Sequence, residues 1–309
     1  ILLYVGYRQH VLDKLRQVAP SAIAGAAGLL AIAWLINSVR WAMLLRVAGI
    51  KENAAYLASL YYIGMFFSQI LPTGAGGDAV RMLELYRRGH RPAPVVVATL
   101  QERLLGMGVS MLVGLMAAAA HLTHFPAAVR PILIGLPLAA IAAVAIFLYP
   151  RLPLGVAAKM GTWPVFRGLK KHPILHRLTA AIEPAAQLPP LTPARLVPIL
   201  LVTLAGVLFS ISVWWALGLA VGTGVGFGGF CLVIPLVWVI AMTPSLGGAG
   251  VREGGFVWLM GMFAVPTDRS LAVAALYLIV QLLLAAVGGV FLLLRIWQGG
   301  WKRNPEQSA

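Results

Sequence analysis

The stretch Leu71-Pro-Thr-Gly-Ala-Gly-Gly-Asp78-Ala-Val-Arg81 interrupts an apolar segment with a proline, three glycines and an acidic residue. A related break, Thr243-Pro-Ser-Leu-Gly-Gly-Ala-Gly-Val-Arg252-Glu253, recurs in the second half of the chain. Irregular backbone at membrane depth is tolerated only where it is buried in protein or lines a wet cavity, because lipid offers no hydrogen-bond partners. Transporters build binding sites from such discontinuous helices. The two breaks therefore predict a transport site formed by two broken segments.

The composition places these breaks in a membrane protein. Hydrophobic residues make up 60% of the chain, charged residues 11%, and the mean hydropathy is +0.88, whereas ordinary soluble domains carry about 25% charged residues. The apolar runs are long and do not alternate in polarity, which argues against a β-barrel. The predicted fold class is all-α, a polytopic integral membrane helix bundle with two pseudo-repeated halves and broken or re-entrant helices.

The basic charge indicates orientation in a membrane more than nucleic-acid binding. Lys and Arg number 24 against nine Asp and Glu, giving a net charge of +15, and the cations gather between the apolar spans. This is the pattern of the positive-inside rule, with added attraction to anionic lipid headgroups. We therefore expect anionic membrane lipids as partners and no nucleic acid; the oligomeric state is left open.

The chain divides into long spans, short apolar pieces and basic loops. We treat residues 1–309 as a single membrane domain, with a first half at 1–149, a cytoplasmic basic loop at 150–195, a second half at 196–297 and a cytoplasmic tail at 298–309. Residues 1–6 resemble the end of a truncated first helix, and residues 7–20 a short interfacial helix. The expected spans are 22–48, 94–120, 130–149, 196–220 and 270–295, with shorter apolar pieces at 55–71, 228–243 and 254–265.

The orientation of the second broken segment is not decided by the sequence. The basic cluster Arg87-Arg88-Gly-His-Arg91 and the C-terminus both point to the cytoplasm, so spans 94–120 and 270–295 run in opposite directions. Either 228–265 is a re-entrant hairpin entered from outside, or the repeat is inverted.

Ionisable residues within the apolar regions are candidate site residues, because a charge at mid-bilayer costs at least about 2.5 kcal/mol unless it has a partner. Asp78, Glu84, Glu102 and Glu253 each have an arginine nearby: Arg81, Arg87 or Arg88, Arg103 and Arg252, respectively. Asp78 also occupies a position typical of a helix N-cap. We expect Glu102 to pair with Arg81 or Arg252, Arg103 to pair with Asp78, and Arg40 to need an acceptor.

These residues give two interpretations. An excess of arginines over acids would leave positive charge in a cavity, suited to a phosphate or carboxylate headgroup; the alternative is a set of structural ion pairs. The predicted lipid-binding set is Arg40, Asp78, Arg81, Glu102, Arg103, Arg252 and Glu253. The predicted backbone or hinge set is Pro72, Gly74, Gly76, Gly77, Pro244, Gly247, Gly248 and Gly250, where a helix start could hold an anion or small residues could pack helices.

Enzyme and metal signatures find little support. The Gly-Gly-Asp78 stretch resembles the motif of intramembrane aspartyl proteases but lacks the second acid of a two-carboxylate mechanism. His172 and His176 have a metal-like spacing, but Pro173 disfavours a helix across them. No P-loop occurs in the sequence and Cys231 is the single cysteine. We predict no catalytic residues, no metal and no cofactor.

The motifs resemble the flippase-like family named for the transmembrane region of lysylphosphatidylglycerol synthase, the membrane part of the multiple peptide resistance factor. The resemblance covers about residues 1–297 and is carried by Asn37-Ser-Val-Arg40-Trp41, Phe67-Ser-Gln-Ile-Leu-Pro72, Gly76-Gly-Asp78-Ala-Val-Arg81, Glu102-Arg103-Leu-Leu-Gly106 and Pro244-Ser-Leu-Gly-Gly-Ala-Gly-Val-Arg252-Glu253-Gly. It implies a multi-pass inner-membrane protein that moves a lipid between leaflets, with a hopanoid as one candidate cargo. Lysyl transfer is not expected, because no aminoacyl-transferase domain follows Trp301 in this sequence.

The leading hypothesis is a lipid translocase whose arginines receive an anionic headgroup while the acidic residues hold them and exchange protons. The alternatives are a membrane enzyme with Asp78 or Glu102 as general base, and a scaffold for a lipid-biosynthetic enzyme.

Overall fold

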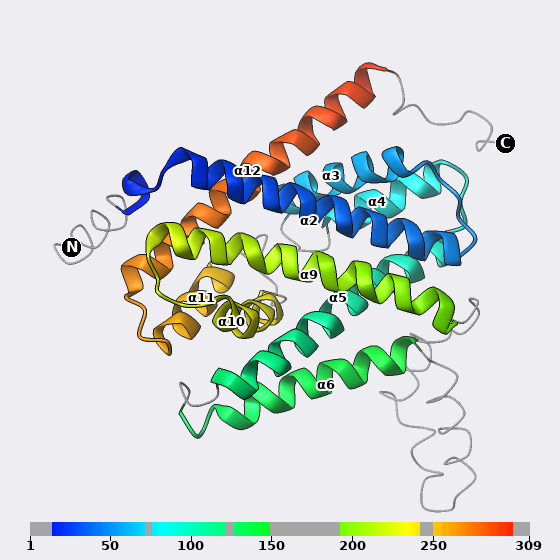
Figure 1. Cartoon of the computed structure of the whole chain (residues 1–309). Helices are drawn as coiled ribbons and strands as arrows, with labels where there is room; N and C mark the ends of the chain where they lie inside the picture. The colour runs from blue at the N-terminus through cyan, green and yellow to red at the C-terminus, as the bar shows by residue number, and fades with distance from the viewer. Residues whose placement is uncertain (1–13, 72–75, 122–125, 149–191, 242–249, 299–309) are drawn as a thin grey trace, which may run out of the picture.

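The structure is a computed structural model and describes residues 14–71, 76–121, 126–148, 192–241 and 250–298 (Figure 1). These residues form helices and turns, without a strand among them. In chain order the helices are α2 (Pro20–Val47), α3 (Ala54–Ile70), α4 (Gly76–Arg87), α5 (Pro92–His121), α6 (Arg130–Leu148), α9 (Pro193–Val221), α10 (Phe227–Ile240), α11 (Val251–Gly261) and α12 (Thr267–Trp297). The all-α prediction is confirmed.

Four helices are long and apolar enough to cross a membrane. They are α2, α5, α9 and α12, and their apolar segments run from 27 to 31 residues, where about 20 residues cross the hydrocarbon core. Each begins and ends within three residues of a predicted span. The predicted span 130–149 forms α6, which is shorter at 19 residues. The chain is a multi-pass helical membrane protein.

The first broken segment folds back on itself. Helices α3 and α4 pack against each other, and we call them the first hairpin. Glu52 before α3 accepts a hydrogen bond from Arg88 Nη1 at 3.0 Å, and its other oxygen lies 2.8 Å from His90 Nε2 after α4. The first hairpin therefore starts and finishes at the same end of the bundle.

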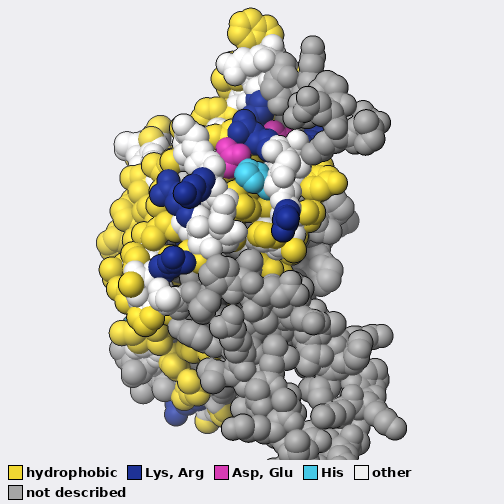
Figure 2. Space-filling view, turned by 90° about the vertical axis from the view of Figure 1, so that its right-hand side faces the viewer, with side chains coloured by type: hydrophobic (Ala, Val, Ile, Leu, Met, Phe, Trp, Pro, Cys, Tyr) yellow, Lys and Arg dark blue, Asp and Glu magenta, His cyan; other side chains and the backbone are white. Residues whose placement is uncertain are grey.

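We call this end the basic end because exposed cations gather on it. Figure 2, which faces the right-hand side of Figure 1, shows arginine and lysine side chains spread over this surface. The exposed cations of the two turns are Arg46, Lys51, Arg87, Arg88 and Arg91. Such a surface is typical of the side that the positive-inside rule places in the cytoplasm.

The second broken segment opens at the opposite end. Helices α10 and α11 pack together as the second hairpin. Arg269, at the start of α12, donates from Nη1 to the carbonyl oxygen of Gly222, just before α10, at 2.5 Å. The two hairpins thus enter the bundle from opposite ends, and the second set of helices runs in the inverted direction. The inverted repeat is therefore observed, and entry of 228–265 from outside stays a prediction.

The helices pack as two related sets. Helices α2, α3, α4 and α5 have the same order of long, short, short and long as α9, α10, α11 and α12. Helix α2 packs along α9, while each hairpin packs on the long helix of the other set, α3 on α12 and α10 on α5. The predicted loop at 150–195 lies almost wholly outside the described residues, as do residues 1–13 and nearly all of the tail. The division at those boundaries stays a prediction.

Glycines allow the closest approaches between these helices. A side chain on Gly77 in α4 would overlap the carbonyl oxygen of Gly64 in α3, and one on Gly288 in α12 would overlap that of Tyr62 in α3. In α9, a Cβ on Gly206 would lie 2.7 Å from Asn37 Oδ1 of α2. Small residues at such crossings are the usual means of helix association in membranes. They let α3 lie close against α4 and α12, and α2 close against α9.

Candidate functional site

Three helices bring five of the predicted site residues together. Arg40 comes from α2, Asp78 and Arg81 from α4, and Glu102 and Arg103 from α5; we call them the arginine cluster. Asp78 pairs through Oδ1 with Arg81 and through Oδ2 with Arg103. Glu102 pairs through Oε1 with Arg40 at 3.2 Å and through Oε2 with Arg81 at 3.1 Å. Each of the four carboxylate oxygens therefore has its own guanidinium partner.

Helix geometry explains why these pairs form. Asp78 and Arg81 are three residues apart in the first two turns of α4 and share a face. Glu102 and Arg103 are adjacent, so their side chains point about 100° apart and meet different partners. The predicted pairing of Arg103 with Asp78 is confirmed, and Glu102 takes Arg81 from the two predicted choices. Arg40 finds its acceptor in Glu102.

Aromatic rings enclose the central arginine. The guanidinium carbon of Arg81 lies 4.6 Å from the ring centroid of Trp41 and 4.4 Å from that of Tyr61. Trp41 is held by a hydrogen bond from its Nε1 to Thr99 Oγ1 at 3.2 Å. A guanidinium in this position is stabilised by the negative faces of the rings. Arg81 is thus fixed by two carboxylates and two rings.

The arginine cluster combines burial with an excess of positive charge. Arg81 and Glu102 are 4% and 2% exposed, and Arg40 and Asp78 are also buried. The side chain of Arg103 is 38% exposed, which makes it the accessible member. Three arginines against two carboxylates leave a formal charge of +1. This excess agrees with the predicted balance of charge.

Arg252 forms a separate contact set at the second hairpin. Its Nη2 donates to Glu253 Oε1 at 2.7 Å, and its Nη1 donates to Gln281 Oε1 of α12 at 2.8 Å. The ring of Tyr277, 5.2 Å from the guanidinium, stacks on Trp214 with ring centroids 3.9 Å apart. We call Arg252, Glu253 and Gln281 the second polar set. Its single arginine and single carboxylate balance, unlike those of the arginine cluster.

The structure adds to what the sequence indicated about two of the acids. Glu84, which has Arg87 and Arg88 nearby in the sequence, also lies 3.5 Å from Arg295 near the end of the chain. Asp78 was expected as an N-cap, but α4 begins at Gly76 and Asp78 lies inside its first turn. Its carboxylate pairs with Arg81, one turn further along α4, and with Arg103 of α5.

The hinge residues are described only in part. Gly76 and Gly77 are buried in the first turn of α4. Gly250 precedes α11 with φ of 84°, a left-handed backbone that favours glycine, and its N–H donates to Glu253 Oε2 at 2.6 Å. Pro72, Gly74, Pro244, Gly247 and Gly248 lie outside the described residues. Their predicted role as hinges is not tested.

Some contact residues were missed by sequence reasoning. Gln281 is a polar residue inside the apolar span 267–297, which is a signal that could have been used. Tyr61, Tyr277 and Arg295 give no such signal, because aromatic residues and a cation at the end of a span are common in membrane helices. Only packing shows that they contact the predicted site residues.

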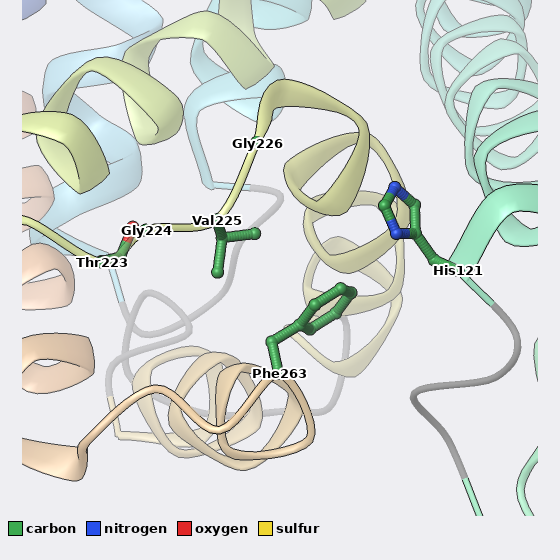
Figure 3. Close-up of a pocket in the computed structure, with 6 residues that line it drawn as sticks. All are labelled: His121, Thr223, Gly224, Val225, Gly226 and Phe263. Carbon is green, nitrogen blue, oxygen red and sulfur yellow. The ribbon is translucent and has the colours of Figure 1, made fainter.

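A cavity of about 260 Å³ lies away from the arginine cluster, at the end where the second hairpin opens. Figure 3 shows the turn Thr223–Gly226 on one side of it and the rings of His121 and Phe263 on the other. His121 is the last residue of α5, so three connections meet here. Within the described ranges, no group of three histidine, cysteine or carboxylate residues could hold a metal; His172 and His176 lie outside those ranges.

Comparison with known proteins matches residues 2–289 to a family described as the lysylphosphatidylglycerol synthase TM region. A stretch of 114 residues is 31% identical to glycosyltransferase AglD of Haloferax volcanii. This alignment covers 35% of the present chain and 18% of AglD, so the shared part is a small fraction of that protein. No solved structure matches.

Proposed function

Because the chain belongs to the family of lysylphosphatidylglycerol synthase TM regions, we propose that it moves an anionic lipid between the leaflets of the bacterial inner membrane. The observation that carries the proposal is the arginine cluster: a formal charge of +1 between α2, α4 and α5, built from Arg40, Asp78, Arg81, Glu102 and Arg103. A phosphate headgroup fits such a site, because guanidinium groups bind phosphate oxygens in pairs. The apolar chains would remain among the exposed Leu, Ile and Val side chains of the helices.

The arginines take different parts in this proposal. Arg81 is enclosed by Trp41, Tyr61 and two carboxylates, so it stabilises the site. Arg103 is partly exposed and is the member that a headgroup reaches first. Arg252 and Glu253 lie at the start of α11, in the second hairpin, and would offer the headgroup a second binding position.

The test is lipid transfer by the purified protein in vesicles. Fluorescent phosphatidylglycerol in the inner leaflet is protected from a reductant, and transfer exposes it. Arg103→Gln is expected to slow transfer by about tenfold or more, because a charge-assisted hydrogen bond to the phosphate is lost. Arg91→Gln, which removes an exposed cation at the basic end, is the matched control and should leave the rate unchanged.

Three results would contradict the proposal. The first is transfer by vesicles with the native protein that is no faster than in empty vesicles. The second is an Arg103→Gln protein that transfers lipid as fast as the native protein. The third is an Arg91→Gln protein that transfers lipid as slowly as Arg103→Gln. Fluorescent phosphatidylcholine and a hopanoid placed in the same vesicles identify the cargo. Preference for either over phosphatidylglycerol would exclude an anionic headgroup as the recognised feature.

The similarity to AglD supports a second candidate, an enzyme that acts on a lipid headgroup or lipid carrier. Asp78 or Glu102 would then be the general base. All four oxygens of these carboxylates have arginine partners, so a base would first have to leave an ion pair. A covalent lipid product after incubation with labelled lipids and a sugar donor would favour the enzyme, and its absence alongside transfer would favour the translocase.

A further inference from the structure

The end of α12 holds both arms of the first hairpin. Arg295, in the last turn of α12, lies with Nη1 3.5 Å from Glu84 Oε1 of α4 and donates from Nη2 to Ser59 Oγ of α3 at 3.3 Å. Its guanidinium also lies 4.4 Å from the ring centroid of Tyr56 in α3. Glu84 is 5% exposed. Residues 236 positions apart are thus joined at the basic end.

The end of α5 has the corresponding place at the second hairpin. His121 is the last residue of α5, and its Nε2 lies 2.9 Å from where a Cβ on Gly228 of α10 would be. Its ring lies edge-on to Phe263, beyond α11, at 5.6 Å. Like Arg295, it therefore contacts chain from both arms of the hairpin that belongs to the other set of helices.

The two contacts differ in what surrounds them. Arg295 sits beside a buried carboxylate, a hydroxyl and a ring, whereas the contact of His121 borders the cavity of about 260 Å³ (Figure 3). A buried carboxylate without its cation is strongly disfavoured. The first hairpin is therefore held shut at the basic end, while a space remains beside the second hairpin at the opposite end.

We propose that Arg295 and Glu84 form a latch that selects between two conformations of the bundle. In the conformation described, the latch is engaged and the cavity beside His121 is present at the opposite end. When the latch is released, the first hairpin moves away from the end of α12, and α5 with the second hairpin closes the cavity beside His121. A ligand that binds one conformation better than the other shifts the balance. The role of the latch in transport rests on the proposed function, whereas the change of conformation can be tested independently of it.

The latch is tested by distances between spin labels in lipid vesicles. Labels are placed through Tyr86→Cys on α4 and Trp297→Cys on α12, both exposed neighbours of the latch, after Cys231→Ser removes the native thiol. A second pair, Ala128→Cys after α5 and Trp258→Cys on α11, reports on the cavity end. Releasing the latch by Arg295→Gln or Glu84→Gln is expected to lengthen the first distance and shorten the second.

The controls separate charge pairing from general damage. The exchange of charges in Arg295→Glu with Glu84→Arg should restore the native distances, and Arg91→Gln should not change them. Unchanged distances in a folded Arg295→Gln protein overturn the latch, as does failure of the exchange to restore them when it is folded. If the distances respond but the native protein transfers no lipid, the transport function fails and the latch stands. If lipid moves and the distances do not respond, only the latch fails.

Discussion

At the scale of single residues, Glu102 is the most buried charge of the arginine cluster. It is 2% exposed and pairs with Arg40 and Arg81 from two other helices. Removing one partner of a buried ion pair leaves a charge uncompensated, and the cost greatly exceeds the net contribution of the intact pair. Glu102 therefore stabilises the fold first and any ligand only through its arginines.

We expect Glu102→Gln to destabilise the protein by about 3–5 kcal/mol, the usual cost of breaking a buried pair. Thermal unfolding in detergent, followed by the loss of monodisperse protein on heating, measures the change. Glu52→Gln, at the turns of the basic end, is the matched control, with an expected change below about 1 kcal/mol because its partners Arg88 and His90 are both reached by solvent. Equal stability of the two variants would show that Glu102 is not a structural centre.

The ion pair between Asp78 and its neighbour Arg81 could be predicted from the sequence, and the distant pair of Glu84 with Arg295 could not. Helical spacing predicts that Asp78 meets Arg81 and that Glu102 and Arg103 diverge. It contains nothing that brings Arg295 to Glu84, because that contact depends on how α12 crosses the first hairpin. Sequence reasoning therefore noted only the arginines next to Glu84 in the chain and proposed no partner for it.

At the scale of elements, the close packing of α3 against α4 depends on glycine at position 77, where any side chain would collide with α3. Gly77 faces the backbone of Gly64 and the hydroxyl of Ser68 across the contact of α3 with α4. The backbone there has little room to move, since α3 is also held by α12 and α4 by α5. Gly77 thus sets how closely the two arms approach.

Gly77→Ala is expected to destabilise the protein by about 1–3 kcal/mol, as overpacking in a tight contact does, and to weaken the pairing of Asp78 in the next position. Gly25→Ala on α2, where no atom lies within 4 Å of the added carbon, should be neutral or stabilising, because alanine favours a helix by about 1 kcal/mol. Thermal unfolding of the two variants side by side tests this. A stable Gly77→Ala protein would mean that the arms can separate freely.

The element boundaries were largely predictable, and the direction of the hairpins was not. Long apolar runs fix the four spanning helices to within three residues. The two short broken pieces are equally apolar in either direction, so periodicity cannot say from which end they enter. The direction becomes visible only in the folded structure, where Arg88 contacts Glu52 and Arg269 contacts Gly222.

At the scale of the whole molecule, the two ends of the bundle carry different charge. Arg46, Lys51, Arg87, Arg88 and Arg91 are exposed at the basic end (Figure 2). At the opposite end Asp268 and Arg269 offset each other, and the described cations there are Lys14, Arg16 and Arg130. The charge asymmetry, more than the fold, sets which way such a bundle inserts.

We expect the basic end, together with the C-terminus, to face the cytoplasm. In a Cys231→Ser background, Lys51→Cys should react with a membrane-impermeant maleimide only in inside-out vesicles, and Ala128→Cys only in right-side-out vesicles. The reverse pattern would place the basic end outside and contradict the orientation.

The arginine cluster also bears on how the protein is made. All its members lie between Arg40 and Arg103, so every charge within it has a partner before the ribosome has produced the second set of helices. Charges that enter the hydrocarbon region are costly until they are paired. Arg295, by contrast, is synthesised last and must find Glu84 in a hairpin that is already inserted. Membrane insertion can thus proceed in two stages. The ion pairs of the arginine cluster form in the first stage, and Glu84 pairs with Arg295 only in the second, after α12 has been inserted.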